Sequence, residues 1–198
     1  MIIYDISKSI PDTPPYEGDP ETVCEMIKSI DEGDEYNLSM FSISSHTGTH
    51  IDSPFHFDNE GKKIDELRLS TFYGKCSVIS TDRILTGGDM EQLLPKCRKR
   101  LIIHTTGEDG GIENSAAQVI ADSDLVLIGI DRSSIAASFD TMRVHRILAS
   151  SNITVLENLD LENIKDGNDY TLCAFPIRLD GFEAAPCRAI LFEQEKGF

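Results

Sequence analysis

A histidine-rich segment, residues 45–57, constrains this chain more than any other feature of its sequence. Three of the chain's five histidines fall between residues 46 and 56, interleaved with glycine, proline and β-branched residues that disfavour a helix. In an extended chain the side chains alternate between two faces. One face then carries His46, His50, Asp52 and His56. The other face carries the packing residues Ile51, Phe55 and Phe57. We therefore predict an extended segment that gathers three imidazoles and a carboxylate on one side, with Gly48 leaving room beside them.

Converging imidazoles and a carboxylate indicate a metal site. Protonated imidazoles held together repel one another, and neutral ones each need a hydrogen-bond partner. A divalent transition metal removes both difficulties, because imidazole nitrogen and carboxylate oxygen are ligands for zinc, manganese and iron. Asp52 has two oxygens and can bridge two ions. The alternative is a polar cluster on a solvated loop, which four aligned groups make the weaker interpretation.

A second group of residues points to the same chemistry. Glu157 shares the apolar face of a predicted strand with Ile153 and Val155, and a carboxylate there is costly unless it is paired or bound to metal. His145 lies on the apolar side of a preceding predicted helix. A lone histidine in that position is more often a core residue, but together with Glu157 it can form the second half of the site.

Composition excludes several classes of function. The 198 residues carry 18 basic and 34 acidic side chains, and a net charge of −16 should repel a nucleic-acid backbone. No apolar run has the roughly 20 residues that a membrane span needs, and we predict no signal peptide. Five scattered cysteines, without any C-x-x-C pair, indicate reduced thiols in a cytoplasmic protein.

The pattern of apolar runs predicts one mixed α/β domain covering residues 1–198. Helices are expected around residues 90–94, 116–121 and 142–148, capped by Asp89, by Asn114 or Ser115, and by Ser138 or Asp140. A proline-rich stretch, residues 10–20, is expected to be an ordered arm without regular structure. Strands are expected at residues 2–6, 36–45, 72–80, 101–103, 125–130, 153–161, 170–177 and 187–192.

Residues 46–56 resemble the H-x-G-T-H-x-D-x-P-x-H signature of the metal-dependent hydrolases called "putative cyclases", which include bacterial kynurenine formamidases and isatin hydrolases. The resemblance extends over nearly the whole chain, through Asp5-Ile6-Ser7, Gly129-Ile130-Asp131, Glu157-Asn158-Leu159 and Phe175-Pro176-Ile177-Arg178. It implies a layered β/β/α domain of the swivelling type, assembled as a homodimer or homotetramer.

The resemblance also implies roles for individual residues. His46, His50 and Asp52 would hold one metal ion, and Asp52 would bridge to a second ion held by His145 and Glu157. His56 would be the catalytic acid and base. The cofactor would be zinc or manganese, two ions per chain, and the reaction would be hydrolysis of the amide bond of N-formylkynurenine or another aryl formamide.

Departures from the family pattern fall in the presumed substrate pocket. The chain has no tryptophan and offers Tyr16 in the proline-rich stretch where the aryl-formamide enzymes typically have one. It has His104-Thr105-Thr106 where the family often has Arg-Thr-Gly-Trp, and Ser134-Ile135-Ala136 where Ser-x-Asp is frequent. Tyr16, Phe41 and His104 are the candidate substrate-binding residues. A cyclic amide or a lactone, as in isatin hydrolases, is the alternative substrate.

Two rival functions remain open from the sequence. A serine or cysteine hydrolase is disfavoured because there is no G-x-S-x-G motif and no cysteine close to a histidine. A metal-dependent ligand-binding protein without turnover would keep His46, His50 and Asp52 but would not need His56.

Overall fold

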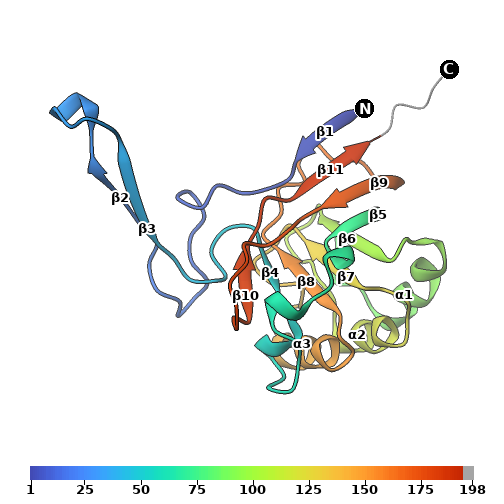
Figure 1. Cartoon of the computed structure of the whole chain (residues 1–198). Coiled ribbons are helices and arrows are strands. Elements are labelled where there is room, and N and C mark those ends of the chain that lie inside the picture. The colour runs from blue at the N-terminus through green and yellow to red at the C-terminus, as the bar shows by residue number, and fades with distance from the viewer. Residues whose placement is uncertain (194–198) are drawn as a thin grey trace.

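The computed structural model describes residues 1–193, which are built around one curled nine-stranded sheet (Figure 1). Its order is β1-β11-β9-β5-β6-β7-β8-β4-β10, and a separate ribbon pairs β2 with β3. The strands β5, β6, β7 and β8 run parallel to one another, whereas all the other pairs are antiparallel. The strands are β1 (Ile2–Asp5), β2 (Val23–Lys28), β3 (Leu38–Ser42), β4 (His50–Asp52), β5 (Tyr73–Thr81), β6 (Arg100–Thr105), β7 (Leu127–Ile130), β8 (Thr154–Glu157), β9 (Gly167–Cys173), β10 (Ala184–Pro186) and β11 (Ile190–Glu193).

The helices cover one face of the parallel strands (Figure 1). None of the helices in the described part of the chain is long and apolar enough to cross a membrane. The α-helices are α1 (Gly87–Leu93), α2 (Asn114–Ala121) and α3 (Thr141–Ser150). The 3₁₀ helices are η1 (Ile30–Glu32), η2 (Pro54–His56), η3 (Ile64–Glu66), η4 (Leu69–Thr71) and η5 (Leu94–Lys96).

Two hydrophobic cores give the molecule its layers. Alternation along β6 sends Leu101 and Ile103 toward the helices, where they pack with Ile120 and Leu148, and sends Ile102 into the other core. That other core holds side chains from strands and loops but none from an α-helix. Because the curled sheet packs on itself on one side and on helices on the other, the layered mixed α/β fold predicted from the sequence is confirmed.

Several predicted boundaries differ from those of the structure. The segment predicted as a strand at residues 153–161 is a strand only as far as Glu157, because Asn158 adopts a left-handed conformation with φ of +58°. The strands β2 and β10 were not predicted. Thr86, not Asp89, caps α1, and the carboxylate of Asp89, the third residue of the helix, accepts a hydrogen bond from the Thr86 N–H. Glu113, which was not among the predicted caps, precedes α2. Asp140 holds the expected position before α3 but does not cap it, because its carboxylate accepts from the Asn114 N–H of α2 instead.

The ribbon of β2 and β3 stands away from the sheet (Figure 1). The stretch that leads into it, residues 10–20, contains neither helix nor strand, as predicted. The ribbon and the η1 turn between its strands (residues 23–42) are called the arm below.

Core packing predicts that truncating Leu156 lowers the stability of the fold. This residue of β8 is fully buried in the core between the two halves of the sheet. Leu156→Ala should lower the free energy of unfolding by about 2–5 kcal/mol, the range for a buried leucine that leaves a cavity. Leu69→Ala is the control, since Leu69 is 71% exposed, and should change that free energy by less than about 0.5 kcal/mol. Urea unfolding measures both free energies. Similar losses in the two variants would contradict the assignment of Leu156 to the core.

Candidate metal centre

Strand β4 places two candidate ligands in the interior of the sheet. It pairs with β8 on one side and β10 on the other, and its register sets His50 directly opposite Glu157. Side chains opposite each other on neighbouring strands lie on the same face, and so do residues two apart on one strand. His50, Asp52 and Glu157 therefore share one face, and all three are buried.

The orientation of His50 is set by the turn before its strand. The Nδ1 of His50 lies 2.9 Å from the carbonyl oxygen of Gly48 and donates to it, because a carbonyl can only accept. Gly48 has φ of +69°, a conformation that favours glycine. The Nε2 of His50 is left facing Asp52 Oδ1 at 3.3 Å and Glu157 Oε2 at 3.6 Å.

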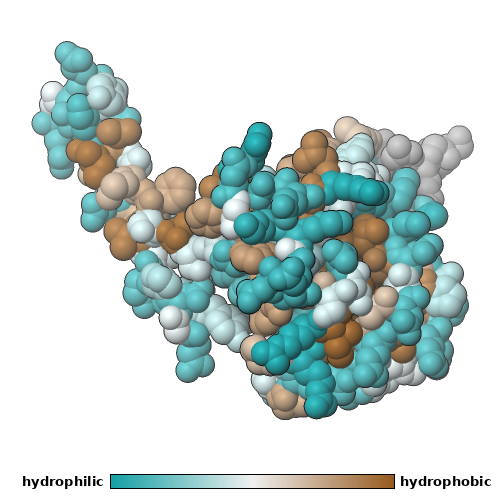
Figure 2. Space-filling model, turned by 60° about the horizontal axis from the view of Figure 1, so that its bottom comes forward, coloured by the Kyte–Doolittle hydropathy of each residue, from teal (hydrophilic) through white to brown (hydrophobic). Residues whose placement is uncertain are grey.

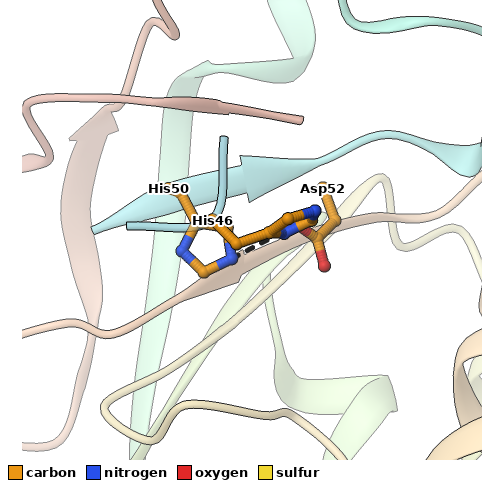
Figure 3. A group of neighbouring side chains, drawn as sticks. All are labelled: His46, His50 and Asp52. Carbon is orange, nitrogen blue, oxygen red and sulfur yellow. Dashed lines mark ion pairs between the residues drawn. The ribbon is translucent and has the colours of Figure 1, made fainter. Parts of the chain in front are cut away.

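His46 reaches the same carboxylate from outside the strand (Figure 3). Its Nδ1 lies 2.9 Å from Asp52 Oδ1, and its Nε2 lies 3.5 Å from Glu183 Oε1. The Ser45 hydroxyl donates to the same Glu183 oxygen. Glu183 therefore holds one side of the His46 ring while Asp52 occupies the other.

His145 completes the group from helix α3. Its Nε2 lies 3.1 Å from Ser134 Oγ and 3.7 Å from Glu157 Oε1. The Phe57 ring stacks on the His145 ring with centroids 4.5 Å apart, so Phe57 faces the site and not the packing side predicted for it. The backbone N–H of Ile135 donates to Glu157 Oε1 at 2.7 Å and fixes that carboxylate.

Burial and mutual charge shift the pKa values of these groups in different directions. Burial by itself would raise the pKa of Asp52, but the adjacent His50 and His46 rings outweigh it and hold that pKa well below its usual range. Burial raises the pKa of Glu157 well above its usual value, and the nearby charge of Asp52 adds to the rise. Burial lowers the pKa of His145 to about 4. His145 is therefore neutral at pH 7, which is the form that binds a metal.

The donor set fits divalent metal. One atom from each of His46, His50 and Asp52 can be chosen so that all lie within 4.8 Å of one another, and the same holds for Asp52, His145 and Glu157. Asp52 Oδ1 is buried and, despite the two nearby rings, accepts no hydrogen bond from the described residues. A cation between two buried carboxylates would satisfy this oxygen and offset their repulsion.

The two groups line a cavity of about 370 Å³, called the catalytic cavity below. His56 also lines it, from η2, with its ring centroid 4.3 Å from that of His46. Burial lowers the pKa of His56. The His56 ring belongs to neither ligand group and makes no hydrogen bond to a residue within 1–193. Tyr16 lies on the wall of the same cavity, as do Glu17 and Asp19.

Two predicted site residues lie elsewhere. Phe41 is on β3 in the arm and is mostly exposed. His104 is on β6, where its Nε2 lies 4.0 Å from Asp131 Oδ2. Neither lines the catalytic cavity. Conversely, sequence reasoning did not single out Glu183 beside His46; it lies far along the chain, and no local pattern marks it.

Comparison with known proteins decides the family. Residues 4–137 match the family described as "Putative cyclase". The chain belongs to this family. It is 31% identical to a kynurenine formamidase of Bacillus anthracis, over 88% of each protein. Among solved structures, this cyclase-family chain resembles one described as a potential metal-dependent hydrolase with cyclase activity, with a TM-score of 0.81, 26% identity and 98% coverage of both chains.

Isatin hydrolase A from Labrenzia aggregata shares the fold, with a TM-score of 0.84 and 19% identity over 98% of this chain and 94% of that one. With the formamidase and the metal-dependent hydrolase as relatives, this cyclase-family chain is a hydrolytic enzyme that depends on a divalent metal.

Loss of one ligand should weaken metal binding. His50→Ala removes a buried nitrogen that faces both carboxylates, and we expect at least a 10-fold weaker affinity for zinc, the smallest effect typical of residues that support a metal ligand. His104→Ala is the matched control, because His104 lies outside both ligand groups. Competition with a chromophoric chelator measures both affinities. Equal affinity of His50→Ala and the wild type would exclude His50 as a ligand.

Proposed function

We propose that this enzyme hydrolyses aryl formamides, with N-formylkynurenine as the substrate and kynurenine and formate as the products. The observation that carries the proposal is the likeness to kynurenine formamidase over 88% of the chain. The site supports it, because both ligand groups and His56 line one cavity whose wall includes the stacked ring of Phe57. A flat aromatic wall suits an aryl ring.

The proposed cofactor is a pair of zinc or manganese ions. His46, His50 and Asp52 would hold one ion, and Asp52, His145 and Glu157 the other, with Asp52 shared. Divalent ions bound there would lower the pKa of a water molecule from about 15.7 toward 7 and would polarise the formyl oxygen. The Gly48 carbonyl and Glu183 support the proposal, because each contacts the ring nitrogen of His50 or His46 that faces away from Asp52.

In the proposed reaction, His56 moves the proton. A ring nitrogen of His56 takes a proton from the attacking water as the new carbon–oxygen bond forms at the formyl carbon. The carbon–nitrogen bond then breaks, and His56 returns the proton to the leaving aryl nitrogen. Its freedom from hydrogen bonds to the described residues and its place beside His46 suit this role.

Variants of His56 and Glu157 separate proton transfer from metal binding. His56→Ala should retain its metal and lose at least about 100-fold in kcat, the scale of a positioned acid or base. Glu157→Gln should lose both metal and rate, because it removes a buried ligand charge. Metal analysis and N-formylkynurenine turnover measure the two effects. Equal metal loss in both variants would make His56 a ligand and would place the base elsewhere.

The same assay tests the rival functions. Turnover of isatin in preference to every formamide would replace the proposal by cyclic-amide hydrolysis, which the shared fold also accommodates. No hydrolysis of any formamide, cyclic amide or lactone by metal-loaded protein would favour a binding protein without turnover.

We also propose that the enzyme works in the cytoplasm. All five cysteines are free, including the exposed Cys24, and structural disulfides are rare in that compartment. Burial raises the pKa of Cys187 to about 12, so this thiol stays protonated and unreactive.

Finally, we propose a homodimer or homotetramer assembled through the arm. A two-stranded ribbon alone is marginally stable in water. The arm exposes large apolar side chains (Figure 2), and a second copy would bury them. Exposures between 41% and 62% are found for Val23, Met26, Ile27, Ile30, Tyr36, Leu38, Met40 and Phe41.

Polar substitutions on the arm should weaken this assembly. The double variant Met40→Ser/Phe41→Ser removes two of the larger exposed apolar groups, and we expect at least a 10-fold rise in the dissociation constant of the oligomer. Leu69→Ser is the control outside the arm, because Leu69 on η4 is an exposed apolar residue too. Analytical ultracentrifugation across a concentration series measures both. A monomeric wild type, or an oligomer indifferent to the double variant, would contradict the role of the arm.

A further inference from the structure

A second cavity adjoins the catalytic cavity. It has a volume of about 560 Å³ and lies between the stretch that precedes the arm and the carboxyl end of β7. The two cavities share four wall residues, namely Tyr16, Glu17, Ser133 and Asn158. A molecule held in the catalytic cavity therefore has the second cavity beside it.

Asn158 marks the boundary between the two cavities. It is only 9% exposed and lines both of them. Its backbone is fully engaged, since its N–H donates to the Arg132 carbonyl at 2.8 Å and its own carbonyl accepts from the Thr49 hydroxyl. Its side chain makes no hydrogen bond to any residue of the described chain, and its amide atoms are not among the fully buried ones, so they remain open to the cavities. An unpartnered amide at this junction indicates a polar ligand group.

Basic side chains are found in the second cavity and not in the first. Lys8 and Arg132 line the second cavity, whereas no lysine or arginine of residues 1–193 lines the catalytic cavity. Lys8 Nζ donates to the Asp131 carbonyl at 2.8 Å and retains two further N–H groups. The Asp131 carboxylate, which lines the same cavity, accepts from the N–H and the hydroxyl of Thr105.

Acidic side chains also line the second cavity. Glu17 lies on the wall shared with the catalytic cavity, and Asp12 lines the second cavity alone. Both are exposed carboxylates on the stretch before the arm. The second cavity is thus lined both by basic side chains, Lys8 and Arg132, and by acidic ones, among which Glu17 and Asp12 come from the stretch before the arm.

We propose that the second cavity is a subsite for the zwitterionic α-amino-acid end of the substrate. The proposal rests on the proposed aryl formamidase function. Lys8, with Arg132 beside it, receives the carboxylate, and Glu17 faces the ammonium group. Asn158 contacts the polar linker between the aryl ring and that end. The formamide meanwhile lies against His56 and the ligand groups in the catalytic cavity.

A pair of substrates that differ only at this end tests the subsite. N-formylkynurenine carries the zwitterion, and N-(2-acetylphenyl)formamide keeps the formamide, ring and ketone but lacks it. The wild type should prefer N-formylkynurenine at least 10-fold in kcat/KM, the scale of a hydrogen bond to a charged group. Lys8→Met should lower this preference about 10-fold. Lys99→Met is the control, since Lys99 is exposed and pairs with Asp124 at 3.4 Å, and it should keep the preference.

The subsite would be overturned if Lys8→Met lowered kcat/KM equally for both substrates. It would also be overturned if the wild type showed no preference between them. Glu17→Gln gives a second test at an exposed position where folding is not at risk. It should raise the KM for N-formylkynurenine about 5-fold and raise that of the truncated formamide by less than twofold. Equal effects on both would again contradict the proposal.

A binding measurement keeps this inference separate from the proposed function. Calorimetry on metal-loaded wild type should show kynurenine binding at least 10-fold more tightly than 2-aminoacetophenone, with the difference lost in Lys8→Met. Failure to hydrolyse either formamide would refute the proposed function alone. Equal affinities for the two amines would refute the subsite even if the formamides are hydrolysed.

Discussion

The antiparallel pairing of β4 with β8 is the constraint on which the site depends. It sets His50 opposite Glu157 and, two residues along, leaves Asp52 on the same buried face. Two carboxylates are thereby held out of water among imidazole rings, an arrangement that is costly until a cation joins it. The other two candidate ligands reach these carboxylates from outside the strand pair. His46 comes from the turn before β4, and His145 comes from α3. The stability of the core and the affinity for metal are consequently properties of the same strand pair.

Local patterns were sufficient to predict much of this arrangement. Alternation correctly placed His50 and Asp52 on one face and Ile51 in the core, because period-two geometry holds wherever a true strand forms. The three central strands were also predicted, β7 from a continuous apolar run, β6 from the compact apolar residues 101–103, and β5 from Val78 and Ile79. The resemblance carried by residues 46–56 predicted the family, and the comparisons confirm it.

The errors have a physical cause in each case. The extended segment was predicted over residues 45–57, but only His50–Asp52 is a strand: residues 45–49 form turns, and Pro54 begins a 3₁₀ turn that rotates Phe57 from the packing side into the cavity. His56 nevertheless lies beside His46, through tertiary structure and not through strand parity. Strand β10 was not predicted because its three residues, Ala184–Pro186, carry almost no β signal, and only their pairing with β4 makes them a strand. Glu183 adjoins that strand, and its contact with His46 was therefore equally invisible.

The order of the strands has a consequence for how the enzyme is made. Strand β1 pairs with β11, and β4 lies between β8 and β10, so two early strands have partners that a ribosome synthesises near the end of the chain. Pairings between residues so distant in sequence form slowly. Until β8 and β10 emerge, the histidine-rich segment has no neighbouring strands, and its exposed edges are open to association with other nascent chains. The metal centre is therefore completed late in biosynthesis, and a truncated chain that lacks β9, β10 and β11 would carry all five proposed ligands without the strand that pairs with β4.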